Sequence, residues 1–467
     1  MLFNSIEFLF FFPLVTLGYF LTPGKWRWVL LLIASFWFYM SFIPWYVLIL
    51  VLAIAVDYSA AIFIEDSKGH SRKTWMVISV LSTVAILFVF KYFNFFADNA
   101  NHLAKMIGWN YNPIILRLAL PIGLSFHTFQ SLSYVIEVYR GNFKAERHLG
   151  VYSLYVMFYP QLVAGPIERP QHLLPKLKES HPFNWDDFNS GLLRMVWGFI
   201  KKMVIADRLS IYVNEVYAHP ADHAGINSWL IMYFFAIQIY CDFSGYSDIA
   251  IGAGQVMGIK MAENFRQPYF AKTIREFWHR WHISLSTWFR DYVYFSLGGS
   301  RTTTLKWIFA LMTTFILSGF WHGANWTFII WGALHGFLLL INSFIGDKKK
   351  GNFLTWIITF HMVCFAWIFF RAPNFHDAGI MFKNLLSFAK PHAPFTTEYE
   401  SMSDMLTLIL MVPFMFIVES KYGTNPIQNM IQGKKLAVKW GISWAMIFIF
   451  LSFAVFKNPQ SFIYFQF

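Results

Sequence analysis

The sequence predicts an all-α protein that crosses a membrane many times. Hydrophobic residues make up 57% of the 467 positions and charged residues only 13%, with a mean hydropathy of +0.46. Apolar stretches of about twenty residues, the length that a helix needs to span a bilayer, recur along the chain. We therefore expect roughly eleven to thirteen membrane segments, some of them re-entrant. They would form one domain over residues 1–467 with no soluble part.

The positive charge is best explained by membrane topology. The 37 Lys and Arg residues outnumber the 25 Asp and Glu residues, which gives a net charge of +12. Most basic residues stand in short loops, where they orient a membrane protein, so we expect no nucleic-acid partner. Cys241 and Cys364 lie in apolar segments without metal-ligand spacing. The sequence therefore predicts that the protein has no metal site. It also predicts that the protein is surrounded by membrane lipid.

The first third of the chain alternates apolar segments with basic loops. Residues 1–20 have no basic region before them and no small-residue cleavage site, which predicts a retained first helix. Lys25 and Arg27 follow directly and place the N-terminus on the extracytoplasmic side. Further spans are expected at 28–43, 45–64, 74–96 and 114–138, with an outer loop at 97–113.

The rest of the chain is less regular. Residues 149–164 are apolar and end in a Gly/Pro turn, and 185–207 mix charge into an apolar segment that is interfacial or shielded. Residues 257–306 are basic and contain no clear span. The absence of an internal repeat disfavours an inverted-repeat transporter. Later spans are expected at 229–256, 307–321, 325–345, 353–370, 404–418 and 440–456.

The most informative polar residue is His322, in the apolar stretch LSGFWHGANWTFIIWGALHGF at 317–337. An imidazole in hydrocarbon costs free energy, so a membrane histidine indicates a functional site. Gly319 and Gly323 permit close helix packing. Asn325 would share a helical face with His322 and orient its ring. The alternative is a packing histidine bonded to a neighbouring carbonyl, and this stretch favours neither interpretation.

Two further polar clusters lie in apolar segments. His127 belongs to a group at 120–141 that lines a cavity or, as the residues favour, forms a hydrogen-bonded packing face. Asp242 and Asp248 are too costly to face lipid and need cationic or hydrogen-bonding partners. Being six residues apart, they would point to different sides unless the helix breaks near Gly245. We expect structural or cavity-lining carboxylates more than catalytic ones.

A third cluster occupies residues 265–299. On one continuous helix, five polar side chains would fall within an arc of roughly 80°. They are Arg275, His279, His282, Ser286 and Arg290. This face either meets lipid headgroups, as the residues alone favour, or forms a cationic pocket for an anionic donor such as a nucleotide-bearing thioester.

Motifs of other catalytic classes are missing from the sequence. There is no G-x-S-x-G elbow, no Walker loop, no H-E-x-x-H and no paired-cysteine metal site. Histidine acting as acid, base or acyl acceptor is therefore the chemistry that the residues indicate.

Four ordered segments resemble the membrane-bound O-acyltransferase family, in its branch of bacterial alginate and peptidoglycan O-acetylation proteins. They are LPIGLSFHTFQSLSY (120–134), CDFSGYSDIAIG (241–252), ENFRQPYFAKTIREFWHRWHISLSTWFRDYVYFSLGG (263–299) and GFWHGANWTFIIWGALHG (319–336). The likeness extends from the N-terminal MLFNSIEFLF to the final FIYFQF. It implies a helical ring around a central tunnel, with a catalytic core at about 115–345.

The resemblance also implies roles for individual residues. His322 matches the essential histidine of the W-H-G-x-x-W/F segment, and His282 matches an upstream polar partner. No role is implied for His279, where relatives often have Arg. Supporting or tunnel-lining positions are assigned to six further residues, some of them on helical geometry alone: Asn325, Arg275, Ser286, Arg290, Asp242 and His127.

The implied activity is O-acetylation of an extracytoplasmic polysaccharide, alginate-like or peptidoglycan, at the bacterial inner membrane. Acetyl-CoA would donate from the cytoplasm, and His322 would act as a general base or a transient acetyl acceptor. An SGNH-type extracytoplasmic partner would complete the transfer. The alternatives are a non-catalytic transporter of an acetyl carrier or lipid-linked sugar, and a DltB-like D-alanyl transfer protein.

Overall fold

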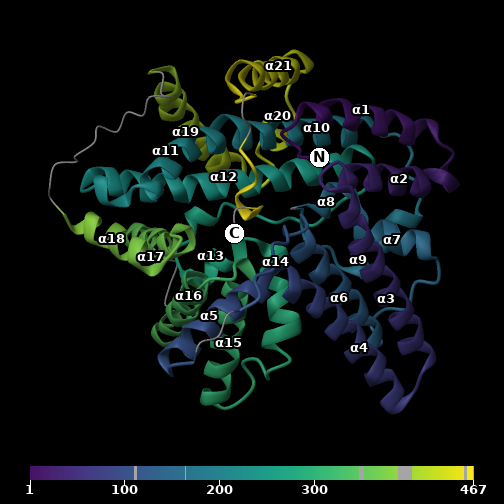
Figure 1. Ribbon diagram of the computed structural model, residues 1–467. Coiled ribbons are helices and arrows are strands. Elements are labelled where there is room, and N and C mark those ends of the chain that lie inside the picture. Colours follow the sequence, from purple (N-terminus) through teal and green to yellow (C-terminus); the bar gives the residue numbers. More distant parts are fainter. Residues whose placement is uncertain (110–112, 164, 347–351, 388–401, 457–459, 466–467) are drawn as a thin grey trace. The chain divides into compact units, whose positions relative to one another are not determined.

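Helices make up almost all of the regular structure in the computed structural model (Figure 1). The structure describes residues 1–109, 113–163, 165–346, 352–387, 402–456 and 460–465, and these contain no β-strand. Within them, eight helices are long and apolar enough to cross a membrane, and α1 (Ile6–Leu21) is a shorter apolar helix. This confirms the prediction of an all-α polytopic membrane protein.

The chain divides into two compact units. Unit 1 comprises Met1, Glu7–Asn184 and Met257–Ala262, and unit 2 comprises Leu2–Ile6, Trp185–Val256 and Glu263–Phe467. His127 belongs to unit 1, and all other candidate site residues belong to unit 2. The single domain and the ring around a tunnel stay predictions.

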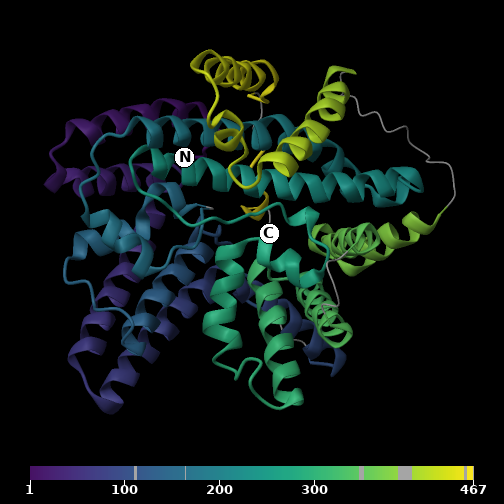
Figure 2. The ribbon, with the colours of Figure 1, turned by 180° about the vertical axis from the view of Figure 1, so that it is seen from behind.

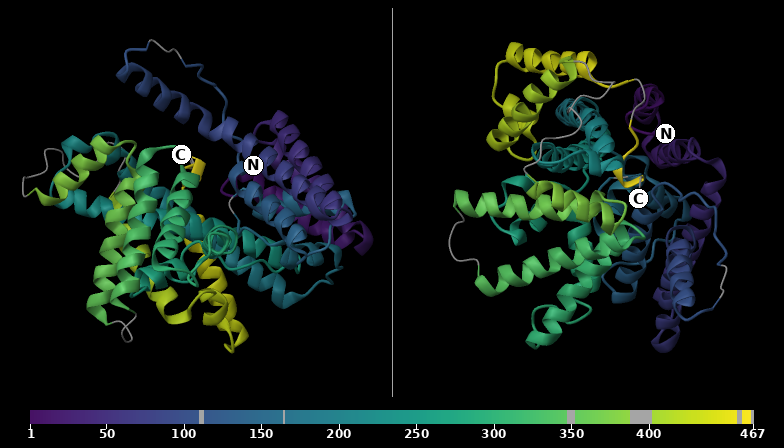
Figure 3. Two further views of the ribbon diagram at one scale, coloured as in Figure 1. Left: turned by 90° about the horizontal axis from the view of Figure 1, so that it is seen from below. Right: turned by 60° about the vertical axis from the view of Figure 1, so that its left-hand side comes forward.

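Unit 1 is built around the packing of α3 (Val47–Asp66), α4 (Gly69–Leu87) and α6 (Leu124–Arg140), which lie side by side in the views of Figures 1 and 3. The buried Asp57 joins two of them, because its carboxylate accepts hydrogen bonds from Ser79 Oγ (2.6 Å) and Thr83 Oγ1 (3.1 Å). The elements of unit 1 that follow α1 are η1 (Gly24–Trp26), α2 (Arg27–Met40), η2 (Pro44–Tyr46), α3 (Val47–Asp66), α4 (Gly69–Leu87), the π-helix η3 (Phe88–Tyr92), α5 (Phe93–Met106), α6 (Leu124–Arg140), α7 (Leu149–Met157), α8 (Tyr159–Leu162) and α9 (Pro170–Lys178).

Two predicted boundaries in unit 1 are wrong. Helix α4 continues through η3 and α5 as one helical stretch, Gly69–Met106, so most of the expected outer loop at 97–113 is helix. The expected span 114–138 begins as non-helical chain, where Leu116 N and O both bond the side chain of Asn94. Helix α6 starts only after Gly123, whose φ of 77° is readily adopted by glycine alone.

Unit 2 contains the remaining helices, and its longest element is α12 (Ile226–Val256). The others are α10 (Trp185–Phe199), the π-helix η4 (Ile200–Ala206), α11 (Asp207–Ala218), η5 (Pro220–Asp222), η6 (Pro268–Phe270), α13 (Ile274–Arg280), α14 (Ile283–Phe289), the π-helix η7 (Arg290–Tyr294), α15 (Thr304–His322), α16 (Trp326–Ile345), α17 (Phe353–Arg371), α18 (Phe375–Leu386), α19 (Met402–Tyr422), α20 (Pro426–Ile431), α21 (Leu436–Phe453) and η8 (Ile463–Phe465).

Glycine allows α10 and η4 to pack closely against α12. A Cβ atom at Gly198 would overlap the carbonyl oxygen of Gly245, and Gly191 meets Gly252 in the same way. Helix α12 is continuous through Gly245, so the helix does not break there, and this glycine permits close approach of α10 and η4 instead. The two acids of α12, Asp242 and Asp248, have different cationic partners.

Glycine also joins α15 to α16, which lie side by side in Figures 1 and 2. Cβ atoms at Gly319 and Gly332 would overlap the carbonyl oxygens of Phe328 and Phe315. This pairing agrees with the small-residue packing expected for the stretch around Gly319.

The continuous helix expected over 275–290 is wrong. Helix α13 ends at Arg280, and His282 has a left-handed backbone with φ 41° before α14 begins. This conformation is uncommon for a residue other than glycine. The break turns His282 away from the face that Arg275 and Arg290 were expected to share with it.

Candidate active site

His322 is the last residue of α15 and is only 3% exposed. Four aromatic rings surround its imidazole, with centroid distances of 4.8 Å to Trp321, 5.1 Å to Trp331, 5.3 Å to Phe370 and 5.3 Å to Tyr464. The side chain is thus removed from bulk water, where an acyl intermediate would otherwise be lost to hydrolysis.

His282 lies in the same cluster of rings. Its imidazole is fully buried, 4.5 Å from the ring of Phe243 and 6.4 Å from that of Trp321. Trp321 therefore contacts both histidines, and the Phe243 ring also lies 4.8 Å from Tyr464. Burial lowers the pKa of His282 to about 3, which keeps its ring neutral. We call His282, His322, Phe243, Trp321 and Tyr464 the histidine site.

Tyr464 is the residue of this site that the sequence did not reveal. It belongs to η8, near the C-terminus, and reaches the site because the preceding chain is held by buried polar groups. Ile463 N donates to Asp242 Oδ2 (2.7 Å), and the carbonyl oxygen of Gln460 accepts from Lys202 Nζ (3.2 Å). No periodicity or motif spacing links residues this far apart, so only the three-dimensional structure brings Tyr464 to His322.

Asp242 is buried and paired with a lysine. Lys202 lies between it and a second acid, with Nζ 2.7 Å from Asp242 Oδ1 and 2.8 Å from Asp207 Oδ1. Burial lowers the pKa of Lys202, but the two carboxylates outweigh this effect and raise it to about 12. The cationic partner that the sequence required is therefore present.

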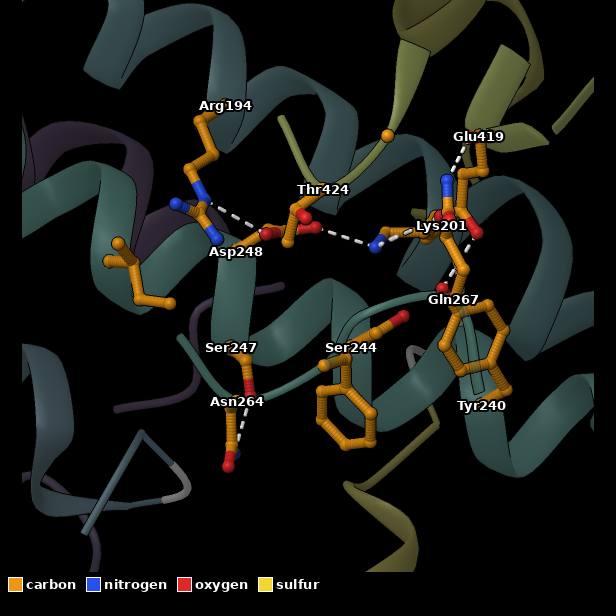
Figure 4. Close-up of a pocket in the computed structure, with 13 residues that line it drawn as sticks. Arg194, Lys201, Tyr240, Ser244, Ser247, Asp248, Asn264, Gln267, Glu419 and Thr424 are labelled. Carbon is orange, nitrogen blue, oxygen red and sulfur yellow. Dashed lines mark hydrogen bonds and ion pairs between the residues drawn. The ribbon is translucent and has the colours of Figure 1, made fainter. Parts of the chain in front are cut away.

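Asp248, the other acid of α12, is paired twice. Arg194 Nε lies 2.9 Å from its Oδ1, and Lys201 Nζ lies 2.5 Å from its Oδ2. Figure 4 shows these groups around a small polar pocket that also contains Glu419. We call the five residues Arg194, Lys201, Lys202, Asp242 and Asp248 the charged core.

Asn325 does not orient His322, which corrects the prediction from helical spacing. Helix α15 ends at His322, so the two residues share no helical face. Asn325 instead caps α16: its Oδ1 accepts from Thr327 N (3.1 Å), and its Nδ2 donates to Pro373 O (2.7 Å). Aromatic side chains pack around the His322 ring.

A cavity of about 620 Å³ lies between α13, α14, η7, α15 and α16. Arg275, Ser286 and Arg290 line it, which agrees with the pocket interpretation of this cluster, whereas His282 does not line it. Arg275 Nη2 donates to Ser343 Oγ (3.0 Å), and Arg290 Nε donates to Asp291 Oδ1 (2.8 Å). The walls are otherwise largely apolar, so the cavity suits a long molecule with an anionic end.

On α15 the cavity is lined by Thr314 and Ser318. These residues are four apart, and His322 is the next at that spacing, so all three lie on one side of the helix. The cavity therefore extends along α15 to within one turn of His322.

His127 is buried in α6 of unit 1. Its two ring nitrogens have no hydrogen-bond partner among the residues that the structure describes. The neighbouring Gln130 donates to Tyr155 O (2.5 Å), as expected for a packing face. A tunnel-lining role for His127 stays a prediction. In the described part of the chain, no three His, Cys, Asp or Glu side chains are grouped as metal ligands.

A many-helix membrane fold with two buried histidines, one of them within a turn of a cationic cavity, agrees with a membrane acyltransferase. The chain belongs to the membrane-bound O-acyltransferase family, whose family model matches residues 147–373. It is 42% identical over 398 residues to a Pseudomonas syringae pv. tomato protein named probable alginate O-acetylase AlgI, covering 83% of this chain and 76% of the relative.

Two other relatives differ in the reaction that their names give. A peptidoglycan O-acetyltransferase of Helicobacter pylori is 34% identical over 429 residues, with 83% of this chain and 80% of the relative covered. A teichoic acid D-alanyltransferase of Bacillus subtilis is 31% identical over 278 residues, with 55% and 69% covered. This chain is thus a membrane O-acyltransferase, and the relatives confirm the family resemblance seen in its motifs.

Proposed function

We propose that this protein takes acetyl groups from cytoplasmic acetyl-CoA and passes them across the inner membrane for O-acetylation of a polysaccharide. The acceptor would be an alginate-like exopolysaccharide or peptidoglycan, as the names of the relatives suggest. The observation that carries this proposal is the cavity, whose cationic lining and course along α15 suit an anionic donor that delivers its acyl end toward His322.

The basic residues near one end of the cavity indicate which side of the membrane that end faces. Ser300, Trp307 and Ser343 line its end at the start of α15 and the end of α16, where Arg301 and Lys306 also stand. Basic residues concentrate on the cytoplasmic side of a membrane protein, so this end would face the cytoplasm. A helix of 19 residues is roughly 28 Å long, so His322 would lie near the opposite side. By the same rule the N-terminus would be extracytoplasmic.

The chemistry is an acyl transfer. The carbon–sulfur bond of the thioester breaks, a carbon–oxygen bond to the acceptor hydroxyl forms, and the hydroxyl proton leaves with the CoA thiol. His322 would accept that proton as a general base, or would itself carry the acetyl group for one step. His282 would either orient the attacking hydroxyl or polarise the thioester carbonyl. An SGNH-type extracytoplasmic transferase would supply this first acceptor hydroxyl and then pass the acetyl group from it to a hydroxyl of the polymer.

Sealed inverted membrane vesicles from a bacterial strain lacking its own copy of the gene would test the proposal. Radiolabelled acetyl-CoA added outside reaches only the cytoplasmic face, while any partner protein stays in the lumen. Wild-type protein should release CoA and label material inside the vesicles. His322→Ala should abolish both, and His361→Ala, which alters a histidine bonded to Tyr233 outside the site, should not.

Full turnover by a folded His322→Ala variant would contradict the catalytic role of His322. A second candidate, D-alanyl transfer from a carrier protein, is suggested by the teichoic acid D-alanyltransferases among the relatives. The same vesicles distinguish the two candidates: a D-alanyl thioester on a carrier protein would be consumed in place of acetyl-CoA.

A further inference from the structure

Asn264 supports the backbone and the side chain of His282. The carbonyl oxygen of Asn264 accepts from Ile283 N (2.9 Å), and Arg266 N donates to Arg280 O (2.9 Å). These two bonds hold the segment 264–266 against the break between α13 and α14. The left-handed backbone of His282 is thereby maintained, although it is unfavourable for a side chain of this size.

The side-chain amide of Asn264 is fully buried and makes four polar contacts. Its Oδ1 lies 3.0 Å from His282 Nδ1, 2.9 Å from Ser284 Oγ and 3.3 Å from Ser284 N. Its Nδ2 donates to Ser247 Oγ (3.1 Å), a bond that Figure 4 shows at the edge of the polar pocket.

These contacts decide which nitrogen of His282 carries the proton. Ser284 N can only donate, so the amide atom that faces it must be the oxygen. An amide oxygen has no proton to give, so His282 Nδ1 must be the donor. The neutral ring then has its basic lone pair on Nε2.

We propose that Asn264 is a positioning residue that holds His282 in the Nδ1–H tautomer and directs a basic Nε2 toward the acyl-transfer site. This inference rests on the proposed function and refines it. A basic Nε2 accepts a hydrogen bond from the attacking hydroxyl, and it has no proton with which to polarise the thioester carbonyl. Of the two roles open to His282, orienting the nucleophile is therefore the one that Asn264 supports.

Asn264 is a close polar neighbour of His282. The rings of Phe243, Phe265 and Trp321 pack around the imidazole. On α12, Asp242 and Asp248 are neutralised by the lysines of the charged core and by Arg194. The other titratable groups of the site are His322, across Trp321, and Tyr464, whose ring lies beside Phe243 and His322.

Three variants in the vesicle assay test this role. Asn264→Ala frees the imidazole to change tautomer, so kcat should fall about 10- to 100-fold with KM nearly unchanged. Asn264→Asp keeps an acceptor oxygen but places a carboxylate beside the ring, which raises the pKa of His282. The rate of Asn264→Asp should approach that of wild type at pH 8. It should fall toward pH 5 because His282 becomes protonated, and the wild-type rate should fall less over the same range. Ser247→Ala, the matched control, leaves the bond to His282 intact.

The possible outcomes separate this inference from the proposed function. Wild-type kcat in a folded Asn264→Ala variant, or a wild-type pH profile in Asn264→Asp, would overturn it while His282→Ala remains inactive. If His282→Ala itself turns over normally, the role of His282 in the proposed function fails instead. Thermal unfolding of each variant shows whether it is folded. If Asn264→Ala does not fold, the pH profile of Asn264→Asp tests the inference instead.

Discussion

The charged core and the histidine site lie in the same unit and are both buried, but their polar side chains have different kinds of neighbours. In the charged core every acid of α12 meets a cation within 3 Å, so charges are neutralised in pairs. In the histidine site the imidazoles are packed by aromatic rings, and burial keeps His282 neutral. Paired charges hold a structure in place, whereas a neutral imidazole in an apolar site can still exchange a proton.

The largest effect on stability is expected from Lys202→Met. It leaves Asp207 and Asp242 buried without their cation and should cost about 3–5 kcal/mol. Lys201→Met is the matched control, because Asp248 keeps its bond to Arg194 and the loss should be smaller. Thermal unfolding in detergent measures both. Equal unfolding temperatures for the two variants would show that the charged core does not depend on these pairs.

Within the aromatic cluster, His322 and His335 should differ in activity. His322→Leu should reduce acyl transfer about 10²- to 10⁴-fold. His335 is also fully buried, against Trp278 (5.0 Å) and Trp331 (4.9 Å), and neither ring nitrogen has a hydrogen-bond partner in the described residues. His335→Leu should therefore keep its activity and raise stability by about 1 kcal/mol, since an unsatisfied polar group is removed. Inactivity of a stable His335→Leu would assign it to the chemistry.

The smallest effect is expected at Asn325, whose side chain caps α16. Asn325→Ala should lower stability by about 1 kcal/mol and leave turnover close to that of wild type. Asn374→Ala removes the equivalent cap of α18, where Asn374 Oδ1 accepts from Asp377 N (2.8 Å), and should behave alike. A much larger loss of turnover in Asn325→Ala than in Asn374→Ala would restore a role for Asn325 beside His322.

The sequence alone determined the membrane-embedded helical class and the family, and it identified His282 and His322 as candidate site residues. A membrane span is recognised from the length and hydropathy of an apolar segment alone. This criterion identified α12 and α15–α17 near their observed bounds. The high cost of isolated charge in lipid also predicted that Asp242 and Asp248 would have cationic partners. These inferences depend on local composition, which the sequence displays directly.

The tertiary structure decided the neighbours of each site residue. Helical periodicity predicted that Asn325 lies beside His322 and that His282 lies beside Arg275. The helix ends between the residues of each pair. Helical spacing does not apply where the backbone leaves the helical conformation. Asn264 and Tyr464 have no spacing that marks them, because their contacts with the histidine site join segments that meet only on folding. Hydrogen bonds between distant residues therefore determine the geometry of the site, and no local pattern encodes them.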